Sequence, residues 1–185
     1  MASQQESSGT PLDARDLWRT PQFVFDYLHR IYNFEMDLAA NVDNKKCKLY
    51  ARYIDEQYNS LTIDWSHWGK VGWLNPPYSD VDPFIDKAIE QAAGGFTTVM
   101  LIPSFNGTSI WEKIYDNATV CNIIGRLSFL AGADFEKITN KGKPNEKIVM
   151  IREGEPVPGN DRASCIVQFG GKPLLPTHIK RDDMK

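Results

Sequence analysis

The residues with the clearest chemical use are four consecutive ones, Asn75-Pro76-Pro77-Tyr78. An amine conjugated to an aromatic ring is a weak nucleophile, and its lone pair becomes available when acceptors hold both hydrogens outside the ring plane. The side-chain oxygen of Asn75 can accept one hydrogen and the backbone carbonyl of Pro76 the other. Consecutive prolines fix the direction of that carbonyl, because each ring locks its own φ and restricts the residue before it. The tetrad is therefore suited to activating an exocyclic amine.

Tyr78 completes the tetrad with a flat ring on which a base can stack, an interaction that contributes about 1–3 kcal/mol per base. A sulfonium methyl donor is already activated, so methyl transfer needs positioning and electrostatics more than a strong general base. A rigid turn leaving a strand would also explain Pro-Pro followed by an aromatic residue. Chance alone, however, produces Asp, Asn or Ser before Pro-Pro-aromatic on the order of 0.01 times in a chain of this length, which favours the catalytic interpretation.

The elements around the tetrad predict an α/β fold. Val71–Leu74 is a short apolar strand that the two prolines end. Apolar residues at helical spacing follow over 84–92, and the continuous apolar run 96–102 is typical of a buried parallel strand. In open α/β sheets ligands bind at the carboxyl ends of the strands, which is where the tetrad stands.

The rest of the chain alternates between helix and strand signals in the same way. Thr20-Pro21 predicts a helix start, with Thr20 as N-cap and Pro21 at the first helical position. Residues 131–146 are expected to form a loop that bears glycine and lysine. The remaining elements are a strand over 34–38, a helix over 110–114, a strand over 120–124, and strand pieces over 148–151 and 165–169 that form an antiparallel hairpin on one edge.

Composition and charge narrow the classes of partner. The chain is 42% hydrophobic, has a net charge of −3 and contains no apolar run long enough for a membrane span. The acidic balance argues against nucleic-acid binding over the whole surface but permits a local basic groove. The cysteines and histidines lack the spacing of metal ligands, so we expect no metal and a reducing cytoplasm.

Two basic features are candidates for contact with phosphates. Arg126 follows Gly125 and could aim a cation at a phosphate near a target base, or it could be a solvated residue at the end of a strand. A basic cluster in the later part of the chain is a candidate nucleic-acid-binding surface, although a solvated loop is the usual explanation for such a run. Its members are Lys137, Lys141, Lys143, Lys147 and Arg152.

The order of several motifs resembles a known family, the phage-type DNA adenine-N6 methyltransferases, which are short Dam-like proteins of phages and prophages. The resemblance runs from about residue 18 to 170, and Asn-Pro-Pro-Tyr is its most specific element. The matching segments are Trp18-Arg19-Thr20-Pro21, Phe34-Glu35-Met36-Asp37-Leu38-Ala39-Ala40, Trp73-Leu74-Asn75-Pro76-Pro77-Tyr78-Ser79, Leu101-Ile102-Pro103, Gly125-Arg126-Leu127-Ser128-Phe129 and Ala163-Ser164.

This resemblance implies a truncated Rossmann-like methyltransferase fold that uses S-adenosylmethionine (AdoMet), with a mostly parallel sheet and an antiparallel edge. It implies a methyltransferase domain over 17–175, between a disordered tail over 1–16 and a polar tail over 176–185, in the cytoplasm of a bacterial host. DNA is the implied substrate, and the two basic features described above supply its expected contacts, Arg126, Lys141, Lys143 and Lys147. The implied cofactor-binding residues are Trp18, Thr20, Pro21, Asp37, Leu38, Ala39, Ala40 and Asn75.

The proposed cofactor segment departs from the usual pattern, because no Gly-x-Gly loop follows its strand. The resemblance places Asp37 to Asn41 there instead. The small Ala39 and Ala40 would allow the methionine part of AdoMet to approach the backbone, and Asp37 would accept hydrogen bonds from its ammonium group. A helix N-cap is an equally good explanation of Asp37.

The tetrad alone leaves the substrate open. It would equally serve a cytosine amine, an adenine in RNA or a protein glutamine, and the acidic charge gives the glutamine reading some support. A catalytically silent nucleic-acid-binding module is a further alternative, but Asn75 and Tyr78 argue against it because folding requires neither. Without a separate recognition domain, we expect residues 43–68 and 131–147 to recognise a short or loosely defined DNA site.

Overall fold

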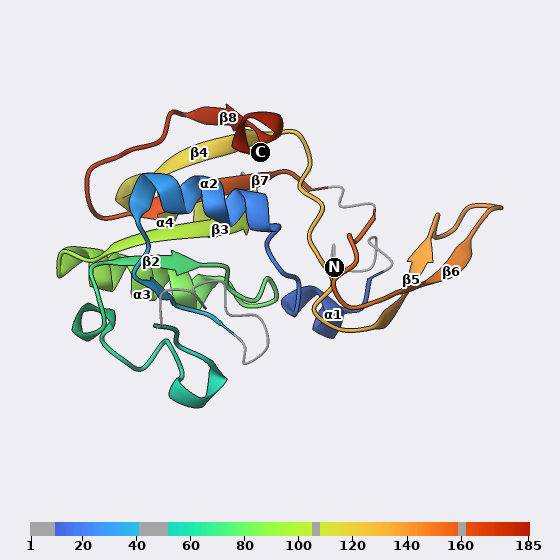
Figure 1. The fold of residues 1–185 in the computed structure, drawn as a ribbon, viewed down its shortest axis with the longest axis horizontal. Helices are drawn as coiled ribbons and strands as arrows, with labels where there is room; N and C mark the ends of the chain where they lie inside the picture. Colours follow the sequence, from blue (N-terminus) through green and yellow to red (C-terminus); the bar gives the residue numbers. More distant parts are fainter. Residues whose placement is uncertain (1–9, 41–51, 105–107, 159–161) are drawn as a thin grey trace.

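The computed structural model describes residues 10–40, 52–104, 108–158 and 162–185, and its centre is a six-stranded sheet of order β1-β2-β3-β7-β4-β8 (Figure 1). The sheet strands are β1 (Met36–Asp37), β2 (Val71–Leu74), β3 (Thr97–Pro103), β4 (Ala118–Ile124), β7 (Ser164–Phe169) and β8 (His178–Lys180). The α-helices are α1 (Leu12–Asp16), α2 (Gln22–Tyr32), α3 (Asp82–Ala93) and α4 (Ser109–Asn117). Short 3-10 helices are η3 (Glu56–Tyr58), η4 (Trp65–His67) and η5 (Arg181–Met184).

Helices cover both faces of this sheet, as the strand sequences require. Successive side chains of a strand point to opposite faces. Trp73 and Val99 therefore join the core beneath α2, whereas their neighbours Leu74 and Met100 join the core beneath α3 and α4. Every residue of β7 is buried, which is typical of a strand covered on both sides. The α/β prediction is confirmed.

The one reversed strand of the main sheet lies inside it. β1, β2 and β3 are parallel, and β4 pairs in parallel with β8 at the other edge. β7 is inserted between β3 and β4 and is antiparallel to both. The sheet is mostly parallel as predicted, but the antiparallel strand is central, so its predicted position at the edge was wrong.

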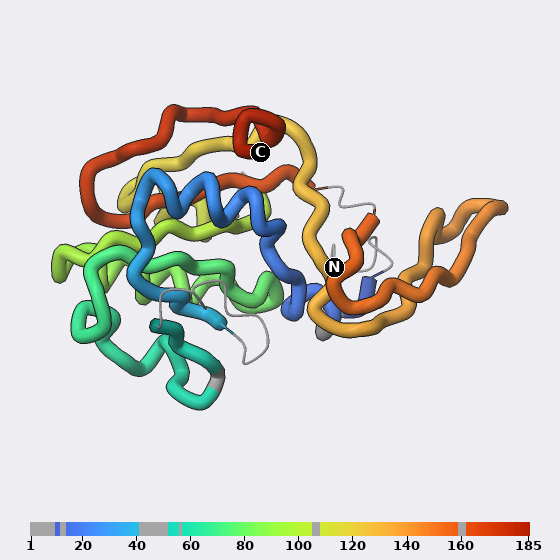
Figure 2. The backbone as a smooth tube through the Cα atoms, viewed as in Figure 1, coloured from blue at the N-terminus to red at the C-terminus, as the bar shows by residue number. Residues whose placement is uncertain are grey.

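The segment expected to be a loop over 131–146 forms half of a second sheet. β5 (Phe135–Thr139) pairs antiparallel with β6 (Lys147–Ile151), and the two form a hairpin that projects from the body (Figures 1 and 2). The connection contains two left-handed residues, Asn140 (φ 54°) and Gly142 (φ 76°), which permit the reversal. Because β6 finds its partner in β5, the expected hairpin of 148–151 with 165–169 does not form.

Both ends of the described chain are more ordered than predicted. Residues 12–16, within the expected disordered tail, form α1, and residues 1–9 lie outside the described part. Within the expected C-terminal tail, β8 pairs with β4 and Met184 of η5 is 1% exposed in the core beneath α2. Apolar Ile179 and Met184 can be buried there, so this segment is a sheet edge and not a polar tail.

The start of α2 differs by one residue from the prediction. Pro21 occupies the N-cap position and Gln22 is the first helical residue. The hydroxyl of Thr20 is buried and accepts no hydrogen bond from the helix, so Thr20 is not the N-cap. Arg19 forms a β-bridge with Leu130, which keeps the chain extended up to the helix. Within the described residues, no helix is long and apolar enough to cross a bilayer, and no three His, Cys, Asp or Glu side chains gather as metal ligands.

Candidate active site at the carboxyl edge of the sheet

Two parallel strands bring the predicted catalytic and cofactor segments together. In the register of β1 and β2, Met36 is opposite Gly72 and Asp37 is opposite Trp73. The strands therefore end side by side, so residues 38–40 and the tetrad leave the same edge of the sheet. A Cβ atom at Gly72 would lie 2.6 Å from Cδ1 of Leu38, so glycine permits this close packing.

A cavity of about 370 Å³ lies at this edge, and its size is within the range of small-molecule sites. Five of the eight predicted cofactor-binding residues line it, whereas Thr20, Pro21 and Asp37 do not. The lining residues are Asp16, Leu17, Trp18, Leu38, Ala39, Ala40, Ile54, Asp55, Asn59, Ser60, Asn75, Pro77 and Phe84. The predicted segments thus form one wall, and residues 54–60 form a second, within the range 43–68 that the sequence analysis expected to recognise DNA.

Asp37 supports the cavity from behind its surface. The residue is 3% exposed, and its Oδ1 accepts a hydrogen bond from the backbone N–H of Ala39 at 3.3 Å. Residues 38–40 form a bend rather than a helix, so the described part gives Asp37 no helix to cap; Asn41 lies outside that part. Asp37 therefore shapes the turn that presents Ala39 and Ala40 to the cavity.

The Asn75 side chain is held at both ends of its amide. Its Nδ2 donates to the backbone carbonyl of Trp18 at 3.3 Å, and its Oδ1 accepts from the hydroxyl of Tyr78 at 3.1 Å. A carbonyl can only accept, so the nitrogen faces Trp18 and the oxygen faces the opposite side. Asn75 thus presents an acceptor oxygen with a second lone pair, as the proposed amine chemistry requires.

Tyr78 belongs to a group of three aromatic rings beside the cavity. Its ring meets Phe129 edge to face at 5.8 Å, and Phe129 stacks on Trp18 at 5.6 Å. Burial raises the pKa of Tyr78 well above that of an ordinary tyrosine, so its hydroxyl stays a neutral donor to Asn75. Sequence reasoning matched Phe129 only as part of a motif; its contact with Tyr78 depends on the fold.

The second wall of the cavity begins with a short extension of the sheet. The N–H of Ile54 donates to the carbonyl of Asp37 at 2.8 Å, and the N–H of Ala40 donates to the carbonyl of Ile54 at 2.9 Å. This parallel pairing carries Asp55 to the same edge as Asn75. The buried indole of Trp65 donates to the carbonyl of Ser60 at 2.9 Å and anchors the end of the wall. In the sequence, the available signal for this wall was an apolar residue followed by an acidic residue, Ile54-Asp55.

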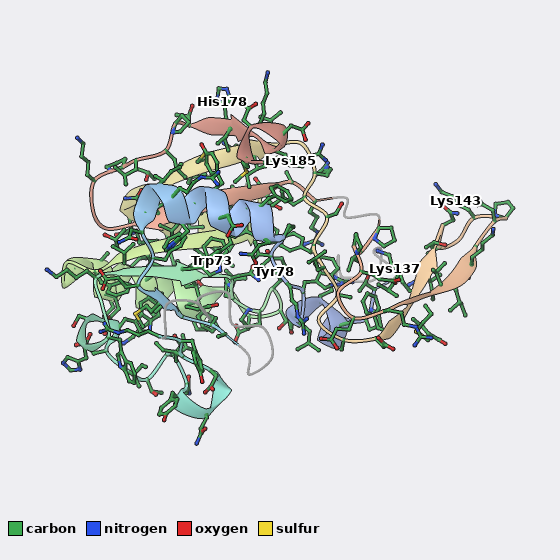
Figure 3. The ribbon with its side chains drawn as sticks, viewed as in Figure 1. Trp73, Tyr78, Lys137, Lys143, His178 and Lys185 are labelled. Carbon is green, nitrogen blue, oxygen red and sulfur yellow. The ribbon has the colours of Figure 1, made fainter. Side chains whose placement is uncertain are left out.

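The predicted basic cluster consists of three exposed lysines, one buried lysine and one ion-paired arginine. Lys141, Lys143 and Lys147 lie on the hairpin and are exposed; Figure 3 shows Lys143 at its far end, away from Tyr78. Lys137 is instead buried, and its Nζ donates to the carbonyl of Pro158 at 2.6 Å. Arg152 forms an ion pair with Asp134 at 2.7 Å. The exposure of the first three is compatible with phosphate contacts, which remain a prediction.

Arg126 is exposed and follows β4, which runs parallel to β2, so it lies at the same edge of the sheet as the tetrad. Three strand spacings of about 4.8 Å put the ends of β4 and β2 roughly 14 Å apart. This separation leaves the phosphate-contact role of Arg126 a prediction.

Comparisons with known proteins identify the family of the chain. A family model described as DNA N-6-adenine-methyltransferase (Dam) matches residues 7–162. A protein of Escherichia phage T1 named DNA N-6-adenine-methyltransferase is 32% identical over 169 residues, which cover 81% of this chain and 69% of that protein. A protein of the same name from Haemophilus phage HP1 is 33% identical over 142 residues, covering 74% of this chain and 79% of that one.

Among solved structures, a SAM-dependent O-methyltransferase from Thermotoga maritima matches 82% of this chain and 65% of its own, with 13% identity and a TM-score of 0.36. No inference about the site is drawn from a likeness this distant. The extent and identity of the sequence matches are decisive, and they confirm the predicted family and enzyme class: the chain belongs to the DNA N-6-adenine-methyltransferase (Dam) family.

Proposed function

We propose that this DNA adenine-N6 methyltransferase binds AdoMet in the cavity at the carboxyl edge of its sheet and methylates an adenine held by Asn75, Pro76 and Tyr78. The observation that carries the proposal is the orientation of the Asn75 amide, whose nitrogen is engaged by Trp18 and whose oxygen can accept from an amine. The same residue lines the cavity, so methyl donor and acceptor would meet at one side chain.

The residues around the cavity fit AdoMet by their chemistry. Asp55, Asn59 and Ser60 line one wall. A side-chain oxygen of each accepts one N–H within the chain and keeps a lone pair that could accept from the hydroxyls of a ribose or from an ammonium group. Ile54 and Phe84 add apolar surface for the adenine ring of AdoMet, and Ala39 and Ala40 leave room for close approach. When bound, AdoMet supplies an activated methyl group on a sulfonium.

The chain's own residues prepare the target amine. The base must leave the DNA stack to reach the tetrad, at a cost of a few kcal/mol. The Asn75 oxygen and the Pro76 carbonyl each accept one N6 hydrogen, so the nitrogen lone pair points away from both acceptors and toward the methyl group. The same two oxygens stabilise the positive charge that develops on N6 as the new bond forms.

The hairpin is the proposed DNA-contacting element. Ile138 is opposite Ile148, and Met150 lies two residues further along, so these three share one face. The other face carries Phe135 and Ile151, which pack on the body. Ile148 is 67% and Met150 44% exposed, and lysines flank them toward the hairpin tip. A two-stranded ribbon of this kind fits a DNA groove, with apolar side chains against bases and lysines on phosphates.

The activity is proposed for the cytoplasm of a bacterial host, because the two relatives are phage proteins named for modifying DNA. The test is incubation with labelled AdoMet and, separately, duplex DNA, adenine-free DNA, RNA and protein, followed by nucleoside and amino-acid analysis. We expect label in N6-methyladenine from DNA. Label in methylcytosine, in RNA or in glutamine would replace this substrate assignment. A folded protein that binds DNA but transfers no label to any substrate would support the silent module.

A further inference from the structure

We infer that Arg19 is a positioning residue: it clamps the segment that carries Trp18 to the base of the hairpin and so holds the carbonyl that orients the Asn75 amide. The inference rests on the proposed function of Asn75. It concerns residues that lie far apart in the sequence, since Arg19 and its ion-pair partner Glu153 are 134 positions apart.

The backbone of Arg19 forms the first part of the clamp. Its N–H donates to the carbonyl of Leu130 at 2.8 Å, and the N–H of Leu130 donates back to the carbonyl of Arg19 at 3.0 Å. Leu130 also bridges Pro156, so the three extended segments lie side by side where the hairpin joins the body (Figure 2). The residue directly after Trp18 is therefore held by a pair of hydrogen bonds.

The side chain of Arg19 closes the second part. Its Nη2 donates to the carbonyl of Gly132 at 3.1 Å and to Oε1 of Glu153 at 2.6 Å, and the side chain is only 17% exposed. Gly132 precedes β5 and Glu153 follows β6, so one guanidinium joins both roots of the hairpin. A Cβ atom at Gly132 would lie 1.9 Å from the carbonyl oxygen of Leu17, so the two backbones are in direct contact.

Trp18 connects the contacts of Arg19 to the active site. Its ring stacks on Phe129 and packs against a small core of Ala131, Ile151 and Val157, while its carbonyl accepts from Nδ2 of Asn75. If the carbonyl moves away, the Tyr78 hydroxyl is the remaining contact given for this amide, and because a hydroxyl can donate or accept, it tolerates a rotation of the amide by half a turn. Its NH₂ group would then face the substrate amine, and two donors cannot hydrogen-bond to each other. Orientation of this one amide therefore depends on the clamp.

The test is Arg19→Met, which keeps most of the apolar stem and removes both side-chain hydrogen bonds. We expect the single-turnover rate of methyl transfer at saturating AdoMet and DNA to fall by about 10-fold or more, since small misplacements at a reacting centre are costly. AdoMet affinity should fall less than the rate, because Arg19 does not line the cavity and Trp18, which does, keeps its stacking on Phe129. Arg19→Lys should recover part of the rate, since an ammonium keeps the charge but sits on a shorter side chain than the Nη2 atom that makes both contacts.

Arg152→Met is the matched control. It breaks an ion pair with Asp134 at the same hairpin root, but its side chain is 65% exposed and makes neither of the two contacts of the Arg19 side chain. Its single-turnover rate should equal the parent's. A readout besides activity is the Asn75 side-chain amide resonance in ¹⁵N spectra, assigned with Asn75→Ala: it should shift in Arg19→Met and stay in place in Arg152→Met.

An unchanged rate and an unchanged amide resonance in folded Arg19→Met would overturn the inference, as would equal rate losses in Arg19→Met and Arg152→Met. Should Arg19→Met fail to fold, Glu153→Gln provides the second variant, because it weakens the ion pair and leaves the contact of Arg19 with Gly132. The clamp then predicts a smaller rate loss and a shift of the Asn75 amide resonance in the same direction. The absence of this shift would refute the inference. Failure of the proposed function is distinguishable, because the parent itself would then methylate no adenine in DNA.

Discussion

Asn75→Ala perturbs stability and catalysis to different extents, and the structure allows both to be estimated. The substitution removes an amide that donates to the Trp18 carbonyl and accepts from the Tyr78 hydroxyl. It keeps both prolines, so the end of β2 and the turn after it should persist. The two former partners border a cavity that water can enter, which limits the penalty for leaving them unpaired.

The expected loss of folding stability is about 1–3 kcal/mol, from two neutral hydrogen bonds of roughly 1 kcal/mol each and partial rehydration. The expected loss of catalysis lies near the top of this range or above it. Asn75 supplies one of two acceptors aimed at the developing charge on N6, and removal of one such preorganised partner typically lowers the rate by about 100-fold or more, equivalent to about 2.7 kcal/mol. AdoMet affinity should fall only modestly, because the other lining residues stay.

Single-turnover transfer of labelled methyl groups measures the chemical step, calorimetry measures AdoMet affinity, and thermal unfolding measures stability. Asn122→Ala is the matched control, since this exposed asparagine lies on β4 away from the cavity; it should match the parent in all three. A folded Asn75→Ala protein that methylates DNA at the parent rate would refute the assignment of Asn75, and with it the proposed mechanism.

Four further predictions concern Tyr78, Asp37, the exposed lysines of the hairpin and the two buried cysteines. Tyr78→Phe removes one neutral hydrogen bond to Asn75 and should cost about 5-fold in rate, whereas Tyr78→Ala also removes the stacking surface and should weaken base capture by about 1–3 kcal/mol in DNA-binding titrations. Asp37→Ala removes the acceptor that shapes the Ala39 turn and should weaken AdoMet binding roughly tenfold by calorimetry; unchanged affinity would show that the turn forms without it. Alanine at all three exposed hairpin lysines should lower the slope of log affinity for DNA against log salt by about 3, and an unchanged slope would show that the tip is only solvated; these residues are Lys141, Lys143 and Lys147. Burial raises the pKa of Cys121 to about 11 and of Cys165 to about 12, from 9.0, so the folded state holds these protons longer than the unfolded chain. Their contribution to stability should be complete below pH 9 and lost as pH rises toward 12, which thermal melts can follow, and both thiols should resist alkylation until the protein unfolds.

Much of the site is encoded in adjacent residues. The prolines after Leu74 end β2 because they cannot donate to a strand ladder, and Gly94-Gly95 ends α3 because Gly95 adopts a left-handed conformation (φ 90°) that favours glycine. The tetrad is recognisable for the same reason, since its acceptors and its ring are neighbours along the chain. The resemblance to the family, in turn, assigned the small residues Ala39 and Ala40 to the cofactor site. The other features depend on local sterics, which a sequence displays directly.

The sequence was a poorer guide wherever the structure depends on which segments pair. Residues 148–151 and 165–169 both read as strands, but only the tertiary structure pairs one with β5 and inserts the other between β3 and β4. Thr20 carries the usual mark of an N-cap, and the bridge of Arg19 with Leu130 overrides it by keeping the chain extended. A local pattern predicts that a strand forms, but it does not predict which other strand pairs with it.

In the candidate site, too, neighbouring residues were predictable from the sequence and contacts between distant segments were not. Asn75 was identified from its neighbours, but the direction of its amide is set by the carbonyl of Trp18, 57 positions earlier. Phe129 reaches Tyr78, and Asp55 reaches the cavity, only because strands that are remote in the sequence end at one edge of the sheet. The sequence by itself determined which groups could activate an amine. Only the fold decided which of them face one another, because contacts between distant segments arise from burying shared apolar surface and carry no signature in either segment alone.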